Sequence, residues 1–79
     1  MRQKIAYPML GQLMGKHNID RQTIAEIIGL SYRNVFKKLY KEQTIHGHVA
    51  LFDIVEASKI AQYFRSLGEV VTIEDIFFS

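Results

Sequence analysis

Apolar residues recur three and four positions apart in each segment of this chain that is long enough to form a secondary-structure element. This spacing puts the apolar side chains on one face of an α-helix. The single proline and the five glycines fall where such helices could begin, end or turn. The sequence therefore predicts an all-α fold, a compact bundle of about five short helices.

Capping residues give the expected limits of these helices. Pro8 suits a first helical turn, where a missing N–H costs nothing, and Asp20, Ser31 and Thr72 are favourable N-cap residues. Gly29 and Gly68 can end helices. Between the last two expected helices, Val70 and Val71 could form a short extended segment. The expected helices cover residues 8–17, residues 21–28, a segment that starts after Ser31, a longer segment from about 51 to 67 and a short segment after Thr72.

A chain of 79 residues has room for one domain, so we expect residues 1–79 to form a single unit with a small core. Such a domain is too small for the deep cleft of an independent enzyme. With no cysteine, it can hold neither a disulfide nor a thiolate zinc site. We expect no catalytic activity, cofactor, metal or small-molecule substrate. No apolar run is long enough to span a membrane, and a reducing, cytoplasmic setting fits the composition.

The charges of the chain are divided unequally between its two halves. Residues 1–41 carry eight basic and two acidic residues, whereas residues 42–79 carry two basic and six acidic residues. Residues 1–6 are expected to form a mobile basic arm. The first half therefore has a positive field that suits a polyanion such as DNA, and the alternative is two solvated faces of opposite sign.

The segment of residues 21–39 contains the most informative spacing in the chain. Ala25 is small enough to let two helices cross closely, and Gly29 can take the left-handed conformation that a tight turn between helices needs. Leu30 and Val35 then anchor the second helix in the core. These inward positions leave four side chains pointing outward together on a face that could enter a major groove: Tyr32, Arg33, Phe36 and Lys37.

In these positions the chain resembles the Cro and repressor family of phage helix-turn-helix regulators. Ala25, Gly29, Leu30 and Val35 match the family's small, glycine and apolar positions, and residues 7–10 and 72–78 also look like short prophage regulators of this group. Arg21 stands where the family commonly has a glutamine. The resemblance implies a sequence-specific transcriptional regulator, a Cro-like repressor without a second domain, that binds an operator as a homodimer.

The expected roles of individual residues follow from this interpretation. Specificity should centre on Arg33. Phe36 could contact a thymine methyl or be buried against the fourth helix. The residues expected to read bases are Ser31, Tyr32, Arg33, Phe36 and Lys37; those expected to contact phosphates are Arg21, Gln22, Asn34, Lys38 and Lys41; and those expected at the dimer interface are Val70, Val71, Phe77 and Phe78.

Other interpretations of the sequence carry less weight. The same helices could bind nothing, or could form a protein-interaction module such as an antitoxin or anti-repressor. His46 and His48 are too few ligands for zinc, because His17 is far away in sequence. Asp53 and Glu56 could imitate a catalytic carboxylate pair, but acids on an exposed helix usually serve solubility.

Overall fold

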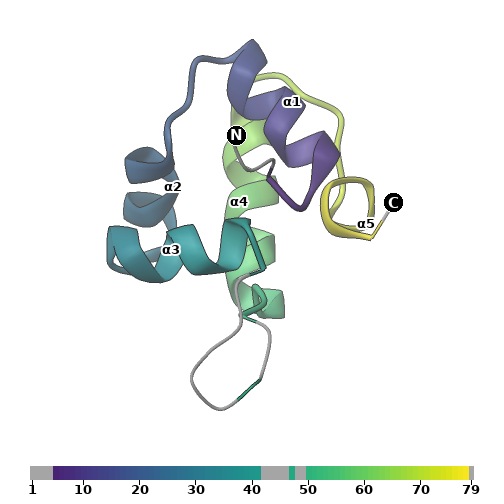
Figure 1. Cartoon of the computed structure of the whole chain (residues 1–79). Helices are drawn as coiled ribbons and strands as arrows, with labels where there is room; N and C mark the ends of the chain where they lie inside the picture. Colours follow the sequence, from purple (N-terminus) through teal and green to yellow (C-terminus); the bar gives the residue numbers. More distant parts are fainter. Residues whose placement is uncertain (1–4, 42–46, 48–49, 79) are drawn as a thin grey trace.

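Helices account for all the regular structure in a computed structural model that describes residues 5–41, 47 and 50–78 (Figure 1). The prediction of an all-α fold of about five helices is confirmed, and the described residues include no strand. None of the helices is long and apolar enough to cross a membrane. The helices are α1 (Pro8–Lys16), α2 (Arg21–Ile28), α3 (Tyr32–Leu39), α4 (Ile54–Ser66) and α5 (Ile73–Phe77).

Side-chain caps begin four of these helices. Asp20 accepts a hydrogen bond from the backbone N–H of Thr23 at 2.8 Å, and Ser31 accepts one from the N–H of Asn34 at 3.3 Å. Thr72 caps α5, as the sequence predicted. Asp53 caps α4 in the same way, so this helix begins at Ile54 and not near residue 51.

Left-handed residues follow the first two helices. Asn18 has a φ of 55° after α1, which ends at Lys16, one residue before the expected limit. Gly29 has a φ of 73°, and the backbone N–H groups of Gly29 and Leu30 both donate to the carbonyl of Ala25, at 2.9 and 3.1 Å. This arrangement closes α2 and turns the chain into α3 within three residues.

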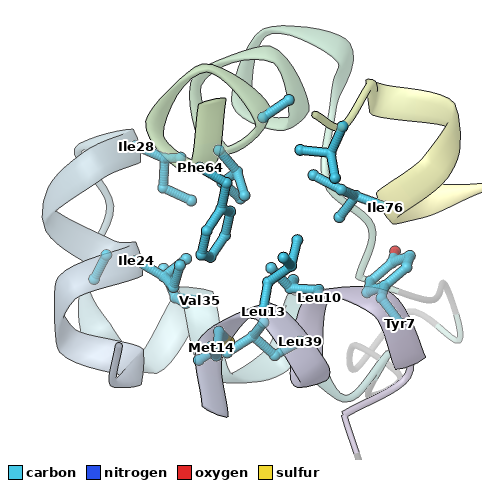
Figure 2. Close-up of a cluster of buried hydrophobic side chains, with 14 residues drawn as sticks. Tyr7, Leu10, Leu13, Met14, Ile24, Ile28, Val35, Leu39, Phe64 and Ile76 are labelled. Carbon is cyan, nitrogen blue, oxygen red and sulfur yellow. The ribbon is translucent and has the colours of Figure 1, made fainter. Parts of the chain in front are cut away.

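The core forms where α4 meets the other helices. In Figure 2 the ring of Phe64 lies between Ile24 and Ile28 of α2 on one side and Leu10 and Leu13 of α1 on the other. Helix α2 packs on α3 and α4, and α5 packs on α1 and α4. The largest side chains with almost no exposed surface are Phe64, Leu10, Ile24, Leu39, Ile60, Ile76 and Val35.

The segment before α1 belongs to the packed structure. Ile5 and Ala6 lie against the core, and the N–H of Ala6 donates to the carbonyl of Leu39 at 2.8 Å. Ile5 and Ala6, which fall within the expected arm of residues 1–6, are therefore packed against the core. Residues 1–4, which carry the arm's basic side chains, lie outside the described part of the chain, as do His46 and His48.

Candidate functional site

Helix α3 presents a polar side to solvent. Val35 and Leu39 have no exposed surface, whereas Arg33 is exposed and Lys37 is partly exposed. Arg33 and Lys37 are one helical turn apart and lie opposite Val35 and Leu39 around the helix axis. The structure therefore brings these two predicted base-reading cations together on the outer side of α3.

An aromatic row covers the side of α3 that adjoins α2. Tyr32, Phe36 and Tyr40 follow each other at intervals of four residues, and the ring centroids of Phe36 and Tyr40 are 4.6 Å apart. The guanidinium of Arg21 lies 5.3 Å from the centroid of Phe36 and 5.7 Å from that of Tyr32. Its Nη1 also donates to the hydroxyl of Tyr40 at 3.1 Å.

These contacts bear on the expected roles of Phe36 and Arg21. Phe36 is half-buried, and its ring contacts are with Tyr32, Tyr40 and Arg21, none of which belongs to α4. Arg21 is held at the edge of α3 by a hydrogen bond and by ring faces, which orient its charge. Because Nη1 alone is engaged by Tyr40, the other N–H groups of the guanidinium can still donate to a phosphate.

An ion pair between Lys38 and Glu56 fixes the side of α3 that lies opposite the aromatic row. The ammonium of Lys38 donates to both carboxylate oxygens of Glu56, at 2.6 and 2.8 Å, and only 21% and 11% of the two side chains are exposed. Glu56 also accepts from the N–H of Asp53 at 3.0 Å and so completes the capping box of α4. The interpretation of these acids as solubilising residues is wrong for Glu56, which is buried, whereas Asp53 is exposed and also caps the helix.

The pattern of Asp53 and Glu56 three residues apart, before an apolar run, is a signal that could have identified this cap from sequence. The partner of Glu56 could not be found that way, because Lys38 is 18 residues away. The predicted phosphate contact of Lys38 remains a prediction, but its charge is already paired within the protein.

The other predicted DNA contacts lie on α2, α3 and the residues beside them. Gln22 and Asn34 are exposed. The hydroxyl of Ser31 is engaged as the cap of α3. Lys41 lies beyond the end of α3, with its ammonium 4.8 Å from the centroid of the Tyr7 ring. The candidate set whose charged or polar groups reach solvent is therefore Arg21, Gln22, Arg33, Asn34, Lys37 and Lys41.

Charge at the start of α2 is stabilised locally. Hydrogen bonds from the backbone and side chain of Thr23 lower the pKa of Asp20, with a smaller contribution from Arg21. The lowered pKa favours the ionised form of Asp20, which is the form that caps α2. Among the described residues, no group of three or more histidine or acidic side chains could hold a metal ion.

The four residues predicted at a dimer interface do not form one surface. Val70 is 97% exposed and Phe78 is 73% exposed, whereas Val71 is buried. Phe77 is half-buried, with its ring 5.1 Å from that of Tyr7 and 5.5 Å from that of Phe52. Val71, which precedes α5, and Phe77, which ends it, thus contribute to the interior.

Comparisons of the chain with family models, with curated proteins and with solved structures found no match.

Proposed function

We propose that the protein binds double-stranded DNA in a sequence-specific manner and regulates transcription, with α2 and α3 acting as a helix-turn-helix. The observation that carries this proposal is the outer side of α3, where Arg33 and Lys37 reach solvent while both neighbouring sides of the helix are fixed by other elements. A helix held in this way can present its outer side chains to base edges in a major groove.

The contacts on each side of α3 support separate roles. Arg33 is suited to donate two hydrogen bonds to a guanine. Lys37, one helical turn further along α3, is suited to contact a base as well. Arg21 is suited to a phosphate, because its guanidinium is already oriented by Tyr40 and Phe36. Lys38 would have to exchange Glu56 for a phosphate, so we expect it to add less affinity than Arg21 does.

The charge distribution favours the same orientation on DNA. Basic residues are concentrated in the half of the chain that contains α2 and α3, and the acidic residues in the half that contains α4 and α5. A duplex would therefore be attracted to the α2 and α3 side and repelled from the other. A Cro-like repressor is the regulator that this arrangement supports best.

Selection from a pool of randomised duplexes tests the proposal. The wild-type protein should enrich a defined sequence. Arg33→Ala should bind that sequence about 1–3 kcal/mol more weakly and should lose its preference at one base pair. Lys59→Ala, which removes an exposed cation from α4, serves as the control and should retain both affinity and preference.

Two results would contradict the proposal. If the selection enriches no sequence, the protein does not recognise DNA in a sequence-specific manner. Equal loss of affinity by Arg33→Ala on selected and random duplexes would assign Arg33 to the backbone and not to a base.

A further inference from the structure

The ion pair between Lys38 and Glu56 takes one cation of α3 largely out of solvent. Only 21% of the Lys38 side chain and 11% of the Glu56 side chain are exposed, and the ammonium donates to both carboxylate oxygens, at 2.6 and 2.8 Å. Partial burial lowers the effective dielectric constant and strengthens the attraction between the two charges relative to that of a pair in water. The positive charge of Lys38 is therefore neutralised within the protein.

Glu56 is fixed in place by the cap of its own helix. Its backbone N–H donates to the carboxylate of Asp53 at 2.7 Å, and its own carboxylate accepts from the backbone N–H of Asp53 at 3.0 Å. These two hydrogen bonds form the capping box at the start of α4. The position of the Glu56 carboxylate is thus set by α4, and the long side chain of Lys38 reaches it from α3.

Transfer of Lys38 from Glu56 to a DNA phosphate would be more unfavourable than the same transfer of an exposed lysine. The buried carboxylate of Glu56 would lose the cation that it contacts. Removing one partner of a buried ion pair costs far more free energy than separating an exposed pair. We therefore expect Lys38 to remain on Glu56 when α3 lies on a duplex.

The position of Lys38 on α3 would otherwise suit a phosphate contact. Asn34, which is exposed and is another predicted phosphate contact, lies one helical turn before Lys38 on the same side of the helix. An ammonium on this side that did not contact Glu56 could extend to the DNA backbone, because the side chain of lysine is long and flexible.

We propose that Glu56 limits the sequence-independent affinity of the protein for DNA by holding Lys38 away from the phosphates. The inference rests on the proposed function and adds a restraint to the same site. A cation that contacts a phosphate strengthens binding to every sequence, because backbone contacts carry no sequence information. Neutralising Lys38 leaves a larger share of the affinity to Arg33 and Lys37 on the outer side of α3.

Titration of a mixed-sequence duplex at several salt concentrations tests the proposal, with Glu56→Gln as the variant and Glu74→Gln as its matched control. Glutamine also serves in a capping box, so Glu56→Gln should keep the start of α4. This variant should bind roughly fivefold more tightly than the wild type at about 0.15 M salt, and its logarithmic affinity should fall more steeply with the logarithm of salt, by about 0.9. Glu74→Gln makes the same change in net charge on α5 and should alter both quantities much less.

A double variant, Lys38→Met with Glu56→Gln, shows whether the gain in affinity comes through Lys38. It has the net charge of the wild type and leaves no unpaired charge from this ion pair between α3 and α4. Because Lys38 contacts no phosphate in the proposed wild-type complex, the double variant should have the wild-type salt dependence. If the double variant retains the tighter binding of Glu56→Gln, the gain does not come from Lys38 and the proposal is overturned.

Acetylation of lysine side chains, followed by tandem mass spectrometry, gives a measurement that needs no DNA. In the protein without DNA, Lys38 should be acetylated more slowly in the wild type than in Glu56→Gln, because the ion pair shields its ammonium. Equal rates in the two proteins would overturn the proposal. When DNA is added to the wild type, acetylation of Lys37 should slow while that of Lys38 should change little.

The remaining outcomes separate this inference from the proposed function. Equal affinity and equal salt dependence for the wild type and Glu56→Gln would overturn the inference and leave DNA binding intact. If neither protein binds a duplex at low salt, the proposed function is contradicted, and the inference fails with it even where acetylation shows the ion pair.

Discussion

The outer side of α3 exposes one kind of side chain, and the start of α4 with the end of α5 exposes the opposite kind. Helix α3 leaves Arg33 and Lys37 in solvent, whereas the start of α4 and the end of α5 leave Ile54 and Phe78 there. A charged group in water is well solvated and needs no partner. An apolar group gains about 25 cal/mol for each Å² that is covered. The difference teaches that covering the exposed apolar side chains would lower the free energy, whereas the exposed cations of α3 are stable in water and would interact with another molecule through their charge.

The largest effect that we expect is the difference in stability loss between substitutions of two adjacent residues, Phe77 and Phe78. The ring of Phe77 contacts Tyr7 and Phe52 inside the molecule, whereas Phe78 is exposed. Phe77→Ala should lower the free energy of unfolding by about 2–4 kcal/mol, somewhat less than for a fully buried ring. Phe78→Ala should change it by less than about 0.5 kcal/mol while weakening self-association.

Urea denaturation and sedimentation of both variants measure this difference. Equal destabilisation by the two substitutions would show that Phe78 belongs to the core, and the comparison between the two surfaces would then fail.

A second pair of neighbours, Lys37 and Lys38, sharpens the comparison on α3 itself. Lys38→Ala leaves the Glu56 carboxylate without its ion-pair partner and should destabilise the fold by about 1–3 kcal/mol. Lys37→Ala should leave stability within about 0.5 kcal/mol and should weaken DNA binding instead.

Thermal denaturation and DNA titration of both variants provide the measurement. If Lys38→Ala keeps full stability and Lys37→Ala loses it, then the roles that the structure gives to the two sides of α3 are reversed.

The local features of this fold could be predicted from sequence, because their causes act within a few residues. Asp20, Ser31 and Thr72 begin helices by accepting hydrogen bonds three residues ahead, and Gly29 ends α2 through its own left-handed conformation. The limits of α2 were predicted for this reason. The same capping chemistry at Asp53 was missed, and so the sequence analysis gave the start of α4 only to within several residues.

Features that depend on packing between distant segments could not be predicted. Arg21 and Tyr40 are 19 residues apart, and their hydrogen bond depends on how α2 crosses α3. The interior position of Phe77 likewise depends on Tyr7 and Phe52, which come from two other parts of the chain. Spacing along one helix shows which residues share a face, but it does not show what covers that face.

The hydrogen bond between Arg21 and Tyr40 offers a smaller test of how α3 is prepared for DNA. Tyr40→Phe removes the acceptor and keeps the ring that lies against Phe36. We expect a stability loss of up to about 1 kcal/mol and weaker binding to every duplex, because the guanidinium is less well oriented. Tyr63→Phe in α4 is the matched control for DNA titration, and equal affinity of the two variants would remove this role from Tyr40.

The smallest effect concerns a cluster that belongs to neither surface. Glu69 accepts from Lys16 at 2.8 Å and from His17 at 2.6 Å, and these donors hold the pKa of Glu69 below its ordinary value of 4.5. A depressed carboxyl pKa contributes stability that is present above about pH 4.5 and is lost as the pH falls through the folded-state value.

Glu69→Gln should therefore be slightly less stable than the wild type at neutral pH and should show a shallower decline of melting temperature in acid. Neither DNA binding nor self-association should change in this variant. Identical acid profiles for the two proteins would show that the cluster does not contribute to stability.

The central claim, that the basic side of the molecule binds DNA, is tested most directly by titrating the wild-type protein into a mixed-sequence duplex at several salt concentrations. The account predicts measurable binding at low salt whose logarithmic affinity falls linearly with the logarithm of salt, by about 0.9 for each phosphate contacted. A folded protein that binds no duplex at low salt, or binds with an affinity independent of salt, would contradict the account and would favour a protein-interaction module.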